Sequence, residues 1–111
     1  MKAIVIHKHG GPEVLSFETA DIATPKPGEV QVRHTAIGLN FIDVYFRTGL
    51  YAAPNGLPLI PGNEGAGVVA AVGEGVTSLK AGDRVAYASA IGAYCELRNI
   101  AADRVVRIPD G

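Results

Sequence analysis

Apolar residues along this chain occur in short runs that glycine and proline separate. The runs are rich in β-branched residues and end at turn-forming residues, so they predict strands. In one of them the residues at 30, 32 and 34 are separated by Gln31, Arg33 and Thr35, the period of two of a strand with one buried face. The predicted strands cover residues 2–8, 15–22, 29–37, 65–72, 84–88, 93–100 and 105–108.

One segment has the spacing of a helix. In residues 41–48 the apolar side chains lie three and four positions apart, Asn40 is placed to cap the start, and Gly49 is placed to end it. The following segment, 51–61, contains three prolines and an Asn-Gly pair, a composition that resists regular structure. We therefore expect one short helix followed by an irregular loop that borders a site.

These elements predict a mostly β protein with minor α content. The chain has 111 residues, enough for one compact domain with one core. Its 14 glycines and 7 prolines can supply the turns and bends of many short strands. The expected architecture is a partly closed β-barrel with one short helix near a cleft.

Charge and composition exclude several classes of function. The formal net charge is −1, which gives no general attraction to nucleic acid or to an anionic membrane. No apolar run approaches the roughly 20 residues that cross a bilayer. Cys95 is the single cysteine, so no intrachain disulfide can form, and we expect a reducing, cytoplasmic location.

The most distinctive stretch is Pro-Gly-Asn-Glu-Gly-Ala-Gly-Val-Val at residues 61–69. Its Gly-Ala-Gly segment superficially matches a phosphate-binding loop, but a strand pattern follows it where such a loop needs a helix. We therefore reject nucleotide binding there. The glycines at 62, 65 and 67 are expected to allow sharp bends or a close approach of neighbouring backbone.

Structural roles can explain several of the charged residues. Asp43 and Arg47 are four positions apart on the predicted helix, and a surface ion pair is a sufficient explanation for them. Glu64 is expected to hold loop amides or to pair with a nearby cation.

The histidines and the cysteine favour structural roles. His7 and His9 fall on one side of a predicted strand, but two ligands without acidic or cysteine neighbours make a weak metal site. His34 lies on the apolar face of its strand and is expected to be hydrogen-bonded in the core or a cleft. Cys95 is expected to be a buried small apolar residue.

With these motifs in place, the chain resembles the N-terminal, GroES-like domain of the medium-chain dehydrogenase/reductase superfamily over essentially all its residues. In the zinc alcohol dehydrogenases of that superfamily, a zinc-binding Cys matches Asn40 and a zinc-binding His matches Asn63. A neutral amide is a poor ligand for zinc, and the four cysteines of the structural zinc lobe are absent from this sequence. The resemblance therefore implies a zinc-free member.

Within the superfamily, the stretch Gly-Leu-Asn-Phe-Ile-Asp-Val-Tyr-Phe-Arg-Thr-Gly-Leu-Tyr at residues 38–51 resembles the quinone oxidoreductase and zeta-crystallin branch. This resemblance implies hydride transfer from NADPH to a small-molecule quinone or conjugated carbonyl. It also implies a cleft lined by Asn40, Tyr45 and Tyr51, with Asn40 and Tyr45 beside the cofactor. Their donors would orient the nicotinamide or stabilise negative charge on the substrate oxygen.

Two functional hypotheses follow. Members of this family place a Rossmann domain after the present region, and residues 1–111 contain no such segment, so we expect an isolated chain to be inactive. The alternative is a stand-alone GroES-like binding module without catalysis. Loss of a partner domain would expose apolar surface, which predicts self-association into a homo-oligomer.

Overall fold

The computed structural model describes residues 1–110. Strands dominate it, and they are joined by one α-helix and two single-turn 3-10 helices. The strands are β1 (Lys2–Val5), β2 (Ser16–Thr19), β3 (Glu29–Ile37), β4 (Glu64–Val72), β5 (Arg84–Ala88), β6 (Leu97–Ala101) and β7 (Val106–Arg107), and the helices are η1 (Pro12–Val14), α1 (Phe41–Thr48) and η2 (Ala102–Arg104).

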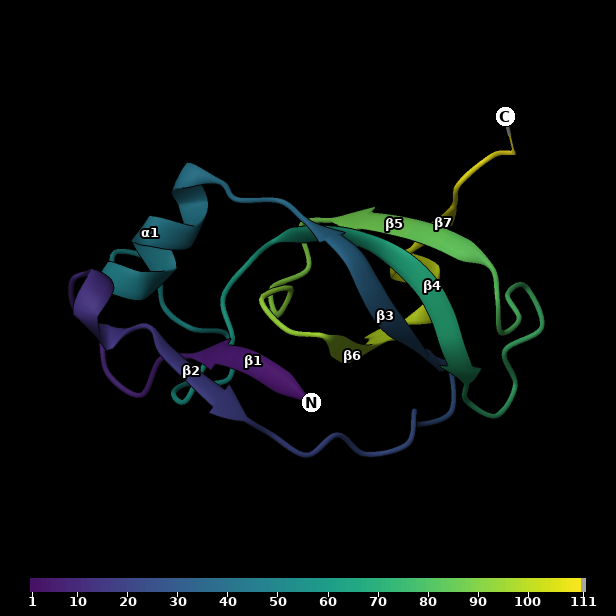
Figure 1. Cartoon of the computed structure of the whole chain (residues 1–111), viewed down its shortest axis with the longest axis horizontal. Helices are drawn as coiled ribbons and strands as arrows, with labels where there is room; N and C mark the ends of the chain where they lie inside the picture. Colours follow the sequence, from purple (N-terminus) through teal and green to yellow (C-terminus); the bar gives the residue numbers. More distant parts are fainter. Residues whose placement is uncertain (111) are drawn as a thin grey trace.

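The strands form two antiparallel sheets (Figure 1). One is the pair β1–β2, and the other has the order β6-β3-β4-β5-β7. The sheets do not close into a complete barrel, and α1 lies at one end of the molecule, away from β7. This arrangement confirms the mostly β, partly closed fold with one short helix.

The core lies on the inner face of the larger sheet. Val30 and Val32 of β3 are fully buried, in agreement with the period of two in the sequence. A second apolar cluster anchors the helical end of the molecule, where Phe46 of α1 packs against Ile6, Val14 and Leu59. Three separate segments therefore hold α1 beside the sheets.

The strand predictions were accurate in the middle of the chain and less so near its ends. β3 and β5 have the predicted bounds, and β4 begins one residue earlier, at Glu64. β1 stops at Val5 instead of residue 8, and β6 starts at Leu97 instead of residue 93. Residues 93–96 instead run between the sheets, where Ile4 donates to the carbonyl of Tyr94 and His34 donates to that of Glu96.

Helix α1 has the predicted bounds and termini. Asn40 is extended at φ −130°, and Gly49 ends the helix in the left-handed conformation at φ 88°. The apolar side chains do not face the core as a stripe, because Phe41 is 76% exposed. Asp43 is instead the buried residue of this helix.

The glycines of the 61–69 stretch have the structural role that we expected. Gly62 has φ 98°, and a Cβ there would overlap the ring of Tyr94. Gly67 lies inside β4, where a Cβ would overlap the carbonyl oxygen of Arg33 on β3. Since Gly65 and Gly67 both belong to a strand, this segment cannot present the helix N-terminus of a phosphate loop.

No helix among residues 1–110 is both long enough and apolar enough to cross a membrane.

Replacing Gly67 with alanine should destabilise the fold by about 1–3 kcal/mol, because the added methyl forces β3 and β4 apart. The measurement is the free energy of unfolding in urea. Ala70→Val on the exposed side of the same strand is the control and should change it by less than about 0.5 kcal/mol. Equal stabilities for Gly67→Ala and the native chain would show that the strands do not approach as closely as described.

Candidate functional site

Two asparagines line one cavity at the start of α1. This cavity, here called the asparagine cavity, measures about 480 Å³. It lies between the start of α1, the start of β4 and the end of β5, and its wall combines amide, hydroxyl and carboxylate groups with apolar side chains. The lining residues are Asn40, Phe41, Ile42, Asn63, Glu64, Ala88 and Ser89.

Asp43 is the buried acceptor that holds Asn40 and Asn63 in place. Its side chain is 5% exposed, and it is the buried charged residue of the described chain. Its Oδ2 accepts hydrogen bonds from the Tyr94 hydroxyl at 2.6 Å and from the Asn40 N–H at 3.1 Å, and its Oδ1 accepts one from Asn63 Nδ2 at 3.0 Å. All three partners are donors, as a buried carboxylate requires.

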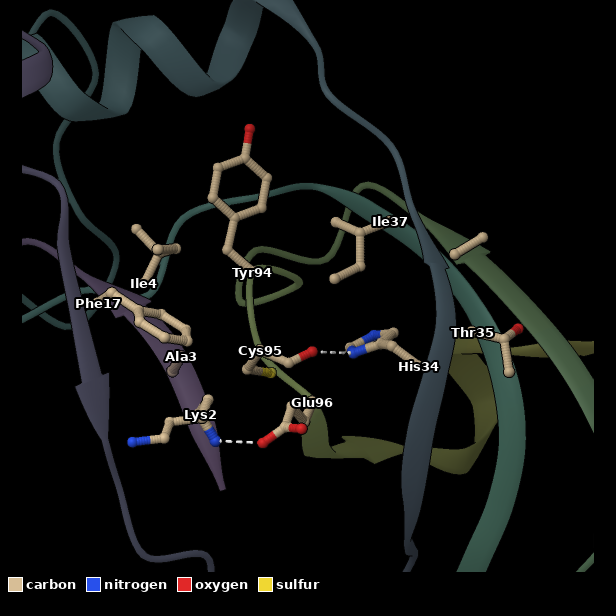
Figure 2. A pocket seen from close by; sticks show the side chains of 11 residues that line it. Lys2, Ala3, Ile4, Phe17, His34, Thr35, Ile37, Tyr94, Cys95 and Glu96 are labelled. Atoms are coloured by element: carbon tan, nitrogen blue, oxygen red, sulfur yellow. Dashed lines mark hydrogen bonds between the residues drawn. The ribbon is translucent and has the colours of Figure 1, made fainter.

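The Tyr94 hydroxyl stays protonated. Figure 2 shows its side chain extending toward α1, where its hydroxyl meets Asp43. Burial, and then the hydrogen bond to Asp43, raise the pKa of Tyr94 above its usual range. Tyr94 is therefore a fixed hydrogen-bond donor to Asp43 and a poor general acid.

The surface ion pair expected between Asp43 and Arg47 was wrong. Asp43 is buried among neutral donors, and Arg47 Nε donates to the carbonyl of Gly10 at 3.2 Å. A local signal existed, because Asn at the cap and an acid three residues later form a capping box. Nothing local could reveal Asn63 or Tyr94 as partners, since they lie 20 and 51 residues away.

The two tyrosines expected in the cleft lie in the middle of α1 and just after it, and the ring of Tyr45 also packs on Phe41 with centroids 6.0 Å apart. Tyr45 and Tyr51 pack edge to face with ring centroids 5.4 Å apart, and the Tyr51 N–H donates to the Tyr45 carbonyl. Within residues 1–110 neither ring lines the asparagine cavity. The structure thus brings Asn40 together with Asn63, and Tyr45 together with Tyr51.

The expected contacts of Glu64 and the expected strand position of His7 and His9 were wrong. The Glu64 carboxylate lies against Gly38 without a hydrogen bond to any described residue, so it holds no loop amide. His7 and His9 lie beyond β1, and His7 pairs with Glu18 at 2.6 Å while His9 contacts the Arg47 carbonyl. Among residues 1–110 no group of three or more His, Cys, Asp or Glu side chains is placed to share a metal ion.

Comparison with known protein families identifies this arrangement of strands and helix. The alcohol dehydrogenase GroES-like domain matches residues 26–110. The chain belongs to this family. This GroES-like domain is also similar in sequence and structure to quinone oxidoreductases, which confirms the resemblance to that branch.

Two relatives and one solved structure show the extent of the similarity. The quinone oxidoreductase of Pseudomonas aeruginosa is 56% identical over 111 residues, which are 99% of this chain and 34% of the relative. Quinone oxidoreductase 1 of Escherichia coli is 53% identical over 107 residues, 96% and 32% of the two chains. A crystal structure of Escherichia coli quinone oxidoreductase complexed with NADPH matches with a TM-score of 0.94 and 51% identity, over 98% of this chain and 33% of that one. The chain thus spans about a third of the length of these relatives.

A second cavity lies between the two sheets of the GroES-like domain. This hairpin cavity measures about 480 Å³ and is lined by β1, β2, β3 and the segment 94–96 (Figure 2). His34 Nδ1 donates to the Cys95 carbonyl at 2.8 Å, because a carbonyl can only accept, and the Tyr87 hydroxyl then donates to His34 Nε2 at 2.7 Å. His34 is thus the hydrogen-bonded cleft histidine that its strand position indicated.

Cys95 behaves as a structural residue. It is 5% exposed and packs with Ala3 and Val5. Burial raises the pKa of its thiol to about 11, which leaves little nucleophilic thiolate at neutral pH.

Acid should weaken the fold through His34. Burial first, and then the charge of Arg98, lower its pKa below the ordinary 6.5. The unfolded chain binds a proton at His34 more readily than the folded chain does. The contribution of neutral His34 to folding stability is therefore complete above pH 6.5 and is lost as the pH falls through the lowered pKa.

The measurement is the melting temperature between about pH 7.5 and about pH 5.5. In His34→Gln the fall in melting temperature over this window should be smaller than in the native domain. The control, exposed His9→Gln, should keep the native fall. Parallel curves for His34→Gln and the native domain would contradict the assignment.

Proposed function

We propose that this chain is the GroES-like, substrate-side domain of a zinc-free NADPH:quinone oxidoreductase. The reaction is hydride transfer from NADPH to a quinone or another conjugated carbonyl. The cavity shared by Asn40 and Asn63 carries the proposal, in a domain 51% identical to an Escherichia coli quinone oxidoreductase solved with NADPH. A reducing cytoplasm suits both this reaction and the free Cys95.

The chemistry of the cavity supports a mechanism without zinc. Amide groups stand where zinc alcohol dehydrogenases carry a thiolate and an imidazole, and amides bind zinc poorly. The Asn63 nitrogen is moreover engaged as a donor to Asp43. These side chains suit hydrogen bonding to an organic ligand.

The nicotinamide end of the cofactor fits this cavity, and its phosphates do not. Phe41 and Ile42 offer apolar surface to a flat ring, and the two asparagines offer polar groups to its carboxamide. The N-terminus of α1 is a poor phosphate site, because the buried Asp43 carboxylate in its first turn repels an anion. We propose that a Rossmann domain, outside residues 1–111, binds the phosphates.

The proposed roles of the residues are electrostatic and positional. Bound NADPH supplies the hydride. Asn40 donates from its amide to the substrate oxygen as negative charge develops there, and the exposed ring of Phe41 covers the reacting groups. Tyr45 and Tyr51 form an aromatic pair that borders the cleft when the second domain is in place.

One observation favours a second candidate, a stand-alone GroES-like binding or self-associating domain. Leu39, Phe41 and Leu50 are 83%, 76% and 68% exposed around the ends of α1. Such apolar surface suits either a second domain or another copy of the chain. Self-association is therefore one outcome of the experiments below.

The proposed function is tested by joining residues 1–111 to the remaining two-thirds of the Escherichia coli enzyme. The joined protein should oxidise NADPH with a quinone, whereas residues 1–111 alone should not. Asn40→Ala should lower kcat/KM about 100-fold, because it removes a donor to the developing charge. Asn55→Ala in the exposed loop is the matched control and should retain full activity.

Two results would contradict the proposal. They are quinone reduction by residues 1–111 alone and an Asn40→Ala enzyme as active as the control. An inactive joined protein together with concentration-dependent sedimentation of residues 1–111 would favour the self-associating domain.

The zinc-free assignment predicts that metals do not affect stability. The melting temperature should be the same in EDTA and in excess Zn²⁺, because a bound ion would stabilise the folded state by mass action. An increase with Zn²⁺ that saturates at one equivalent would contradict the assignment.

A further inference from the structure

Three consecutive backbone carbonyls after β5 accept hydrogen bonds from arginine side chains. Arg104 Nη2 donates to the carbonyl of Ser89 at 2.7 Å, and Arg98 donates from Nη1 and Nη2 to those of Ala90 and Ile91 at 2.7 and 3.0 Å. The two arginines belong to η2 and β6, which follow this segment in the chain. Residues 89–91, here called the clamped loop, are thus held by two later elements.

Ser89 is in a conformation that serine rarely adopts. Its φ is 60°, and every other residue of 1–110 with a positive φ is a glycine. An L side chain is disfavoured in this left-handed region, so Ser89 stays there only while its surroundings hold it. Ala88 and Ser89 both line the asparagine cavity. The conformation of Ser89 therefore sets where this wall of the cavity lies.

Arg98 is itself fixed on the larger sheet. Its guanidinium lies over the ring of buried Tyr87, with Cζ 5.0 Å from the ring centroid. Among residues 1–110 Arg98 has no carboxylate partner, so the carbonyls of the clamped loop are the polar groups that offset its partial burial. Gly92 has φ 122°, and a Cβ there would lie 3.2 Å from Arg98 Cζ. The loop and the arginine therefore depend on each other.

We propose that Arg98 and Arg104 are positioning residues, which hold the clamped loop as a fixed wall of the asparagine cavity. This inference rests on the proposed function and adds two residues to it. A direct transfer between two bound molecules depends on their separation, and a misplacement of about 1 Å can lower its rate about 100-fold. A wall at a fixed place limits how far the reacting molecules move apart. The arginines act through the loop, since neither side chain is part of the cavity wall that residues 1–110 form.

The test is a double-mutant cycle in the protein that joins residues 1–111 to the remainder of the Escherichia coli enzyme. Arg104→Ala should lower kcat/KM for the quinone about tenfold, because Ser89 then relaxes to a negative φ and the wall moves. Glycine adopts a positive φ without strain, so in a Ser89→Gly background the same substitution should lower kcat/KM less than about twofold. A loss that depends on the residue at position 89 identifies the held conformation as its cause.

Arg107→Ala is the matched control. Arg107 is also an exposed arginine, and its Nη2 donates to the carbonyl of Ser78 at 3.2 Å and to Asp83 Oδ2 at 3.1 Å, away from the asparagine cavity. This variant should lower the melting temperature and retain kcat/KM. The comparison separates positioning of the loop from support of the fold.

Relaxation of ¹⁵N in residues 1–111 alone tests the clamp without an activity assay. In the native chain the amides of the clamped loop should be as rigid as those of β5. In Arg98→Lys they should become mobile, because one ammonium group cannot replace the planar guanidinium that holds two carbonyls.

Three results would overturn the inference. They are equal losses of kcat/KM from Arg104→Ala in the two backgrounds, an Arg104→Ala enzyme as active as Arg107→Ala, and a native clamped loop as mobile as the chain ends. An inactive joined protein with the native residues 1–111 would contradict the proposed function, and the relaxation measurement would still decide whether the arginines hold the loop.

Discussion

The hydrogen bonds that converge on the Asp43 carboxylate join three distant parts of the chain. They connect the first turn of α1, the residue before β4 and the segment that runs between the two sheets. A hydrogen bond to a charged group contributes about 1.5–3 kcal/mol, whereas a buried carboxylate without donors would be severely destabilising. The three donors and the carboxylate therefore depend on one another.

The hydrogen bonds to Asp43, here called the polar anchor, explain how α1 can expose apolar residues. A surface helix usually packs an apolar stripe on the core, yet Phe41 and Leu39 beside the cap of α1 are largely exposed. Asp43 and Phe46 hold the helix instead, one through hydrogen bonds and the other in the cluster with Ile6 and Leu59. The remaining apolar side chains of this region stay exposed.

The same anchor divides the polar groups of the cavity by role. The Asn63 nitrogen is used within the fold, whereas the Asn40 side chain keeps its donors. Neutral amides at both positions suit hydrogen bonding better than zinc binding, which is consistent with the zinc-free function proposed above.

The amino-acid sequence by itself determined the local features of this protein. The period of two predicted β3, the spacing between Asn40 and Gly49 predicted α1, and the glycines at 62 and 67 indicated the close backbone approaches, because each depends on neighbouring residues. Only the tertiary structure decided that Asp43 is buried and that Tyr45 and Tyr51 do not line the asparagine cavity. Burial and hydrogen-bond partners depend on residues far away in the chain, and spacing along a helix carries no information about them.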